Sequence, residues 1–232
     1  MSRNFPGSAG NDISIGEPAA VNITGTALTI HAWIAPDTVS GFDNILSKWT
    51  GSNNGGWATF LNNGVFTINI ADGVGTDGAG GGGALPTGRW SSVAAVKNGT
   101  GAGALSVYLN GVSVDSQTSN RSITALATPL RIGRDSAASP FTGRIAEVSL
   151  WAAALTAPQI AQLANYALPL DVQTTGLRGY WPLCGQQSPE PDFAQGNAGT
   201  VNGTVPAASH PFVGLCGEPG VRTRIGWPVR KL

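Results

Sequence analysis

Charged residues are scarce in this 232-residue chain. They make up 11% of it, and 13 basic residues balance 13 acidic ones, so the formal net charge is zero. A chain without net charge has no overall field to attract nucleic acid or a membrane surface, and we expect neither as a partner. No apolar run reaches the length of a transmembrane helix. The first residues lack the apolar segment of a signal peptide, so synthesis in a cytoplasm is expected.

The chain also has few residues of the kinds that bind metals. It contains two cysteines, Cys184 and Cys216, and two histidines, His31 and His210. A structural zinc site needs about four such ligands, so we do not expect one. The cysteines are interpreted first as free buried thiols, with a disulfide formed after release as the alternative. His31 has no evident serine or cysteine partner and is expected to be a packed or surface residue of its strand.

Glycine and proline are abundant, with 33 and 15 residues, and they show no fixed period. Thr, Val, Ile and Ser fill the patterned segments, whereas helix formers such as Glu, Lys and Met are rare. The turn sequences Asn62-Asn63-Gly64 and Asn110-Gly111 predict two β-hairpins. Alternating or apolar segments bounded by turn residues predict short strands over 28–34, 45–49, 57–61, 65–70, 90–97, 105–109, 112–114, 130–133, 145–151 and 179–183.

Two stretches depart from the strand pattern. Residues 72–84 include four consecutive glycines and are expected to form a mobile or ligand-facing loop, because glycine supplies no side chain for packing. Residues 155–163 predict the one helix, with Thr156 as its N-cap and Pro158 in its first turn. The sequence therefore predicts an all-β protein, an antiparallel two-sheet β-sandwich with one short helix. We place this sandwich in residues 1–188 and a Gly/Pro-rich extension, ending in an extended C-terminal arm, in residues 189–232.

An ordered set of short motifs resembles one known family. The motifs are 28–34, 45–48, Trp57, 88–90, 105–112, 130–133 and 141–148. Together they resemble the laminin-G-like branch of the concanavalin-A-like jelly-roll superfamily, over about residues 4 to 165. The opening residues 3–8 and the later stretches 181–185 and 188–192 are similar to laminin-G-domain proteins of bacteriophages and prophages. The resemblance implies a jelly-roll fold and a location in the virion.

The resemblance favours a non-enzymatic structural protein of a phage virion, either a capsid decoration (cement) protein or a tail-associated protein. Its partners would be other virion proteins or copies of itself in a homo-oligomer. The alternative is a carbohydrate-binding adhesion module that recognises a glycan on a host or environmental surface. A retaining glycosidase needs two carboxylates about 5 Å apart, typically alternating on one strand. No strand carries such a pattern, so we expect no catalytic residue and no enzyme activity.

The resemblance also implies a candidate calcium site. Family members often hold calcium where an N-terminal strand meets a strand with an Asp-Glu pair, and the matching residues are Asp12 and Glu147. Calcium prefers several oxygen ligands, carboxylates among them. Ala146 stands where the family usually has Asp, which removes one carboxylate. The alternative is that Glu147 is a solvated strand residue or an ion-pair partner of Arg144.

A sugar site would need an exposed aromatic ring with polar neighbours. Trp57 and Trp90 lie at positions that the family fills with core aromatic residues. We therefore place the candidate ligand site at Trp49, Asn53 and Asn54, beside a polar turn.

Residues 220–232 mix arginine with large apolar side chains. A tail that is only solvated has little use for Trp or Ile, so we interpret this segment as an arm that docks on a partner. The alternative is that it packs back on its own sandwich. The residues expected to bind the partner are Arg222, Arg224, Ile225, Trp227, Arg230 and Lys231.

Overall fold

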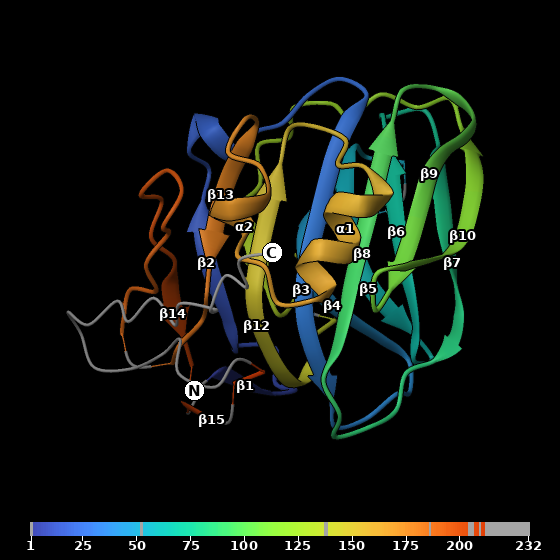
Figure 1. Cartoon of the computed structure of the whole chain (residues 1–232). Helices are drawn as coiled ribbons and strands as arrows, with labels where there is room; N and C mark the ends of the chain where they lie inside the picture. The colour runs from blue at the N-terminus through green and yellow to red at the C-terminus, as the bar shows by residue number, and fades with distance from the viewer. Residues whose placement is uncertain are drawn as a thin grey trace, which may run out of the picture.

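Two antiparallel sheets pack face to face in this protein (Figure 1). The structure is a computed structural model, and it describes residues 2–51, 53–136, 139–185, 187–203, 207–208 and 210–211. The eight-stranded sheet has the order β10 (Val112–Ser119), β9 (Gly101–Leu109), β8 (Ser91–Asn98), β3 (Ala27–Pro36), β12 (Thr142–Trp151), β1 (Ser2–Pro6) and β15 (Ala207–Ala208), with β13 (Leu177–Trp181) paired to β12. The seven-stranded sheet has the order β14 (Thr200–Asn202), β2 (Asp12–Gly16), β11 (Leu130–Ile132), β4 (Phe42–Trp49), β5 (Gly56–Asn62), β6 (Val65–Ala71) and β7 (Thr76–Ala84).

The predicted all-β sandwich and its hairpins are confirmed. Each of the ten predicted strands is present, with small shifts at the ends. Asn110 and Gly111 join β9 to β10 with φ angles of 47° and 83°. Asn63 and Gly64 join β5 to β6 with φ angles of 49° and 81°. Positive φ at both central residues is the type I′ geometry that matches the twist of the flanking strands, which explains why these dipeptides mark hairpins.

The prediction of a loop over residues 72–84 is wrong. Thr76–Ala84 form β7, which pairs antiparallel with β6 at the edge of the seven-stranded sheet. The hydrogen bonds of a β-ladder join backbone atoms, so glycine can take part in them without a side chain. β10, at the edge of the other sheet, lies alongside β7, and Asp115 accepts a hydrogen bond from the Gly80 N–H at 3.0 Å. Pairing with β6 on one side and the contacts with β10 on the other override the low strand propensity of glycine.

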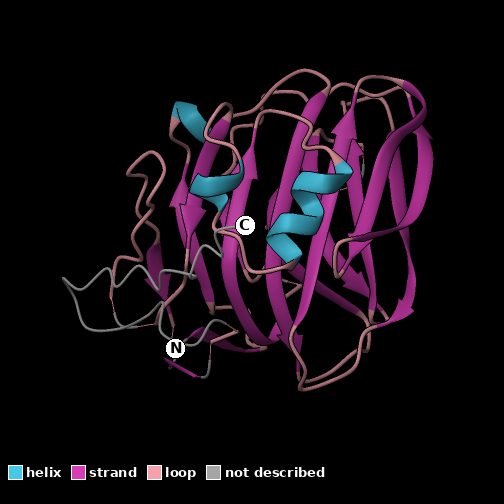
Figure 2. Cartoon of the chain, viewed as in Figure 1, coloured by secondary structure: helices cyan, strands magenta, loops and turns pink. Residues whose placement is uncertain are grey.

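The main core lies between the two sheets and is rich in large apolar side chains. Its largest fully buried members include Trp57, Trp181, Phe5, Phe66 and Phe141. A second cluster, which contains Trp151, Ile160 and Leu163, joins the outer face of the eight-stranded sheet to helix α1 (Ala157–Ala164). Figure 2 shows α1 and α2 (Pro169–Val172) on this side of the sandwich.

Helix α1 begins and ends close to the predicted bounds. The Gln159 side chain accepts a hydrogen bond from the Thr156 N–H at 2.9 Å, which satisfies a donor at the start of the helix. The prediction of a single helix was incomplete, because α2 and a short 3₁₀ turn, η1 (Ala19–Val21), are also present among the described residues. No helix in the described ranges is both long enough and apolar enough to cross a membrane.

Part of the predicted extension after residue 188 packs on the sandwich. Strand β14 adds to the edge of the seven-stranded sheet, and Glu190 forms a buried ion pair with Arg3 of β1 at 2.5 Å. Cys184 is disulfide-bonded, so the interpretation of the cysteines as free thiols is wrong for this residue. Cys216, the second cysteine of the sequence, lies outside the described residues.

Candidate functional site

The outward face of the seven-stranded sheet carries an apolar cluster of its own. Side chains alternate along β5, so Trp57 joins the core between the sheets while Ala58 and Phe60 point away from it. Ala58 and Phe60 form a separate cluster with Trp49 of β4 and Ala71 of β6. Helices α1 and α2 lie against the other sheet, so neither of them shields this face from a ligand.

A small cavity, which we call the aromatic pocket, opens beside this cluster. Its volume is about 150 Å³, and β4, β5, β6 and the segment after β11 supply its lining: Phe42, Asn44, Trp49, Ala58, Phe60, Asn69, Asp135 and Ser139. The Phe42 side chain is 59% exposed, and its ring centroid lies 5.7 Å from that of Phe60. Exposed aromatic rings beside a few fixed polar groups are typical of ligand sites.

Asn44, which lines the aromatic pocket, carries an unpaired buried acceptor. It is 4% exposed, and its Oδ1 atom has no hydrogen-bond partner among the described residues. Its Nδ2 atom donates to the Ser139 carbonyl at 3.4 Å, and the Ser139 N–H donates to Asp135 Oδ1 at 3.1 Å. An unsatisfied buried acceptor is unfavourable by about 1–3 kcal/mol. A hydroxyl group of a ligand could remove that penalty by donating to Asn44 Oδ1.

A β-bulge in β4 explains the orientation of Asn44. Asn44 pairs with Phe60 and Leu46 pairs with Thr59, so Ile45 is an extra residue with no partner of its own. Both Ile45 and Leu46 therefore reach the core between the sheets, which strict alternation would forbid. The bulge leaves Asn44 on the outer face of the sheet.

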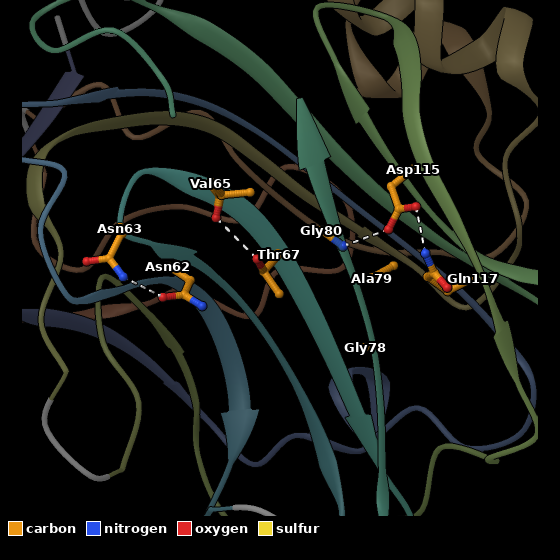
Figure 3. A pocket seen from close by; sticks show the side chains of 9 residues that line it. All are labelled: Asn62, Asn63, Val65, Thr67, Gly78, Ala79, Gly80, Asp115 and Gln117. Carbon is orange, nitrogen blue, oxygen red and sulfur yellow. Dashed lines mark hydrogen bonds between the residues drawn. The ribbon is translucent and has the colours of Figure 1, made fainter. Parts of the chain in front are cut away.

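A larger hollow, which we call the glycine pocket, lies at the β7 edge of the same sheet (Figure 3). Its volume is about 600 Å³, and its lining consists of Asn62, Asn63, Val65, Thr67, Gly78, Ala79, Gly80, Asp115 and Gln117. Asp115 and Gln117 belong to β10, so the edge strands of both sheets contribute to the hollow. Gln117 Nε2 donates to Asp115 Oδ1 at 2.8 Å, which fixes both side chains.

Two buried titratable groups, one in each sheet, line neither pocket. Asp43 of β4 is 5% exposed, its Oδ2 atom has no hydrogen-bond partner within the described ranges, and burial raises its pKa to about 6. His31 of β3 is fully enclosed, and burial lowers its pKa to about 3. Its Nε2 atom lies 3.1 Å from Ser92 Oγ. His31 is thus a packed residue of its strand, one of the two predicted alternatives.

The three residues predicted to bind a ligand fall in different places. Trp49 lines the aromatic pocket but is only 8% exposed, less than predicted. Asn53 and Asn54 lie in the turn between β4 and β5 and line neither pocket. Asn53 Oδ1 accepts from the Thr76 hydroxyl at 3.1 Å, and Asn54 Nδ2 donates to the Thr50 carbonyl at 3.5 Å. The structure therefore joins Trp49 to the candidate site and leaves both asparagines outside it.

The structure does not bring Asp12 and Glu147 together. Asp12 lies in the seven-stranded sheet, where its Oδ2 atom is bonded to Arg131 and lies 3.6 Å from Arg134 Nε. Glu147 lies in the eight-stranded sheet, where its Oε2 atom accepts from the Tyr180 hydroxyl at 2.5 Å. No group of three or more His, Cys, Asp or Glu side chains in the described ranges could hold a metal ion. Calcium binding at this pair stays a prediction.

Glu147 occupies the bulge at which β12 changes its neighbour. Residues 142–145 of β12 pair with β1, and residues 148–151 pair with β13. Glu147 lies between these two segments with a φ angle of 54° and donates its N–H to the Pro182 carbonyl at 3.2 Å. Its Oε1 atom lies 3.1 Å from His210 Nε2. These contacts connect Glu147 to the chain after β13.

The predicted arm, residues 220–232, lies outside the described part of the chain. It contains all six residues expected to bind the partner: Arg222, Arg224, Ile225, Trp227, Arg230 and Lys231.

Sequence reasoning missed most of the aromatic pocket. Phe42, Asn44 and Phe60 occupy outward positions of strands, and Asn69 faces outward on β6. The signal that could have revealed these outward positions was a polar residue at every second position of a predicted strand, such as Asn69 in the segment 65–70. The bulge after Asn44 hides this signal in β4, because it breaks the period of two.

Comparisons with known proteins agree with this architecture. No curated protein matches the sequence at a significant level. Among solved structures, a candidate carbohydrate-binding protein from Bacteroides ovatus is 23% identical with a TM-score of 0.67, and the match covers 91% of this chain and 61% of that one. The heptameric SAP-like pentraxin of Limulus polyphemus is 18% identical with a TM-score of 0.54, and the match covers 70% of this chain and 81% of the pentraxin.

A third similar structure is the CBM40 of the Ruminococcus gnavus IT-sialidase, bound to α2,3 sialyllactose. It is 13% identical with a TM-score of 0.53, and the match covers 71% of this chain and 94% of that module. At these identities the likenesses show the fold alone, and fold does not fix function. The model of the concanavalin A-like lectin/glucanases superfamily, however, matches residues 7–161 of the 232-residue sequence. Because this match spans more than half of the chain, the protein belongs to the concanavalin A-like lectin/glucanase superfamily.

Proposed function

We propose that the protein is a carbohydrate-binding module whose site is the outer face of the seven-stranded sheet, centred on the aromatic pocket. The observation that carries this proposal is the unpaired, buried Oδ1 atom of Asn44 beside the exposed ring of Phe42. A sugar ring offers an apolar face of C–H groups and a rim of hydroxyl groups. Such a ligand would cover the Phe42 ring and donate a hydroxyl to Asn44 in one pose.

The pocket supports binding better than catalysis. Its one carboxylate, Asp135, accepts a hydrogen bond from the Ser139 N–H, and the carboxylate of Asp115 lies in the other pocket. A glycosidase of the retaining type would need a second carboxylate about 5 Å from the first. We therefore propose a non-enzymatic role. The lectin-like fold of the superfamily and the carbohydrate-binding relatives agree with it.

The virion role remains a prediction from the sequence resemblance alone. None of the three solved structures described above is named as a phage protein. The arm on which that role depends lies outside the described residues. The carbohydrate-binding alternative therefore has the stronger support.

The proposal is tested by a glycan array and by titration calorimetry with the best ligand found. Replacing Phe42 by Ala should weaken binding about tenfold or more, because an aromatic contact at the centre of a site typically contributes over 1 kcal/mol. Asn44→Ala should weaken it similarly through the lost hydrogen bond. Phe193→Ala is the matched control, since Phe193 is 46% exposed, its ring lies tilted against that of Tyr180 with 6.1 Å between the centroids, and it lines neither pocket.

Each measurement is made with calcium and with a chelator, which also tests the predicted pair Asp12 and Glu147. Equal affinity of wild-type, Phe42→Ala and Asn44→Ala proteins would refute the aromatic pocket as the site. Absence of binding to every glycan, with the fold intact by circular dichroism, would refute the proposed function.

A further inference from the structure

We infer that the two pockets form one groove that binds an extended, uncharged oligosaccharide and discriminates against anionic sugars. This inference rests on the proposed function and adds to it the class of ligand and the path of the ligand across the sheet. Three observations carry it: the continuity of the pockets, the two glycines that form the floor of the larger one, and the charges around both.

The pockets share two strands. On β5, Phe60 lines the aromatic pocket and Asn62, two residues later, lines the glycine pocket. On β6, Asn69 and Thr67 are related in the same way. Residues two apart on a strand point to the same face and lie about 7 Å from each other. The two pockets are therefore adjacent, and one extended ligand can occupy both along a diagonal across the sheet from β4 to β7.

Gly78 and Gly80 leave room for the side chains of Asn69 and Thr67 to lie along this path. A Cβ atom at Gly78 would lie 2.5 Å from Asn69 Oδ1, and one at Gly80 would lie 2.5 Å from Thr67 Oγ1. Neither glycine has a positive φ angle, so the backbone does not require glycine at either position. The side chains of Asn69 and Thr67 instead occupy the space above these residues. The glycines are thus explained by the close approach of these two side chains, which line the two pockets.

The groove presents hydrogen-bonding groups that suit hydroxyls. Asn62 and Asn63 are exposed at one end, and Asn63 Nδ2 donates to Asn62 Oδ1 at 3.1 Å. Gln117 and Thr67 lie along the sides (Figure 3). Amide side chains can both donate and accept, which matches the dual character of a sugar hydroxyl. The buried, unpaired Asn44 Oδ1 marks the other end as a place where a ligand donor is needed.

The charges of the groove disfavour an anionic ligand. Asp135 lines the aromatic pocket and Asp115 lines the glycine pocket, whereas the lining residues of the two pockets include no Lys, Arg or His. Arg131 lies in the neighbouring strand β11, but its guanidinium forms an ion pair with Asp12. Asp12 forms a second ion pair with Arg134. Of the described residues that line the two pockets, a carboxylate or sulfate would meet two carboxylates and no positive side chain. Repulsion between like charges at about 4 Å is worth about 1–4 kcal/mol, depending on solvent exposure.

The experiment measures binding of the full chain to neutral, uronate-containing, sialylated and sulfated oligosaccharides matched for length. We expect neutral tetrasaccharides to bind at least tenfold more tightly than the anionic ones and more tightly than the corresponding disaccharides. Asp115→Asn and Asp135→Asn keep the size of the side chain. Each should reduce the ratio of the affinity for neutral ligands to the affinity for anionic ligands about fivefold or more.

The length dependence is tested with Gly80→Val, which fills the glycine pocket, and with Gln117→Ala, which leaves its shape nearly intact. Both should reduce tetrasaccharide affinity and leave disaccharide affinity unchanged. Gly10→Val is the control, because a Cβ atom there meets no atom within 4 Å. Should Gly80→Val fail to fold, Gln117→Ala still decides the matter.

The outcomes separate this inference from the function on which it rests. Anionic glycans that bind as tightly as neutral ones, or tetrasaccharides that bind no better than disaccharides, would overturn the inference while the proposed function stands. Loss of all glycan binding only in Phe42→Ala and Asn44→Ala would support the aromatic pocket as an isolated site and overturn the extended groove. Failure of the folded wild-type protein to bind any glycan would refute both.

Discussion

Replacing Asp43 by Asn should stabilise the protein above pH 6 and have little effect at pH 4. Asp43 is buried on β4 beside the candidate site, and its Oδ2 atom lacks a hydrogen-bond partner in the described structure. Burial raises its pKa from 3.8 to about 6. The folded state therefore holds this proton more tightly than the unfolded chain does. Stability falls as the pH rises from about 4 to about 6, because the ionised carboxylate is disfavoured only in the folded state.

The size of this stabilisation follows from the shift in the pKa of Asp43. One pKa unit corresponds to about 1.4 kcal/mol, so a shift of about two units sets an upper limit near 3 kcal/mol. Partial solvation of a group in a strand near the edge of the core lowers this figure, and we expect about 1–3 kcal/mol at pH 8. For a chain of this length the corresponding rise in melting temperature is about 2 to 10 °C.

The assay compares denaturant unfolding of wild-type and Asp43→Asn proteins at pH 4, 5, 6, 7 and 8. The assay uses the difference in unfolding free energy between the two proteins, because His31 changes stability with pH in the opposite direction to Asp43. Burial lowers its pKa to about 3, so its contribution increases stability as the pH rises from about 3 to about 6.5. This contribution is the same in both proteins and cancels. Asp37→Asn removes an exposed carboxylate from the neighbouring loop and serves as the control.

The reasoning would be refuted by a difference in unfolding free energy that stays constant from pH 4 to pH 8. It would also be refuted if Asp43→Asn were less stable than the wild-type protein at pH 8 and equal to it at pH 4.

Two further predictions concern buried charges outside the candidate site. Arg3→Leu removes the ion-pair partner of Glu190 in a site where both side chains are at most 7% exposed, and it should lower the free energy of unfolding by about 3 kcal/mol. The double variant Arg3→Leu/Glu190→Leu should lower the free energy of unfolding by less, and an equal decrease in both variants would contradict a coupled pair. The His31 imidazole should stay neutral between pH 5 and pH 8 because burial lowers its pKa to about 3; a ¹⁵N NMR titration that shows protonation of this ring near pH 6 would contradict its enclosure.

The sequence was sufficient for those features that depend on local chemistry. The dipeptides Asn63-Gly64 and Asn110-Gly111 specify their turns, because few residues other than Asn and Gly adopt positive φ at both central positions. The alternating segment 28–34 specifies a strand with one face in the core, and it forms the middle of β3. The capped segment after Trp151 specifies α1. Each of these needs only neighbours within a few residues.

Features that depend on distant residues escaped the sequence. β7 is a strand because β6 pairs with it and β10 packs alongside it, although the segment has almost no side chains. Asn44 faces outward because a bulge inserts Ile45 into the pairing of β4 with β5. Trp49 was found from its polar neighbourhood, yet Asn53 and Asn54, which suggested that neighbourhood, do not line the pocket. Asn53 accepts a hydrogen bond from Thr76 of β7, and Asn54 donates one to the nearby Thr50 carbonyl. Neither pairing nor bulges leave a mark in a single sequence that distinguishes them from a loop.

Two unfavourable features that meet on the outer face of the seven-stranded sheet argue for a binding role independently of the family. On the eight-stranded sheet, Trp151 is sealed beneath α1, where it can serve stability. On the seven-stranded sheet, Phe42 is 59% exposed and Asn44 keeps a buried acceptor unpaired. A sequence optimised for stability alone would place a polar residue at Phe42 and supply a donor to Asn44. Both unfavourable features occur in one pocket, and a single bound sugar would relieve both. The fold supplies the surface, but this coincidence identifies the part of it that binds.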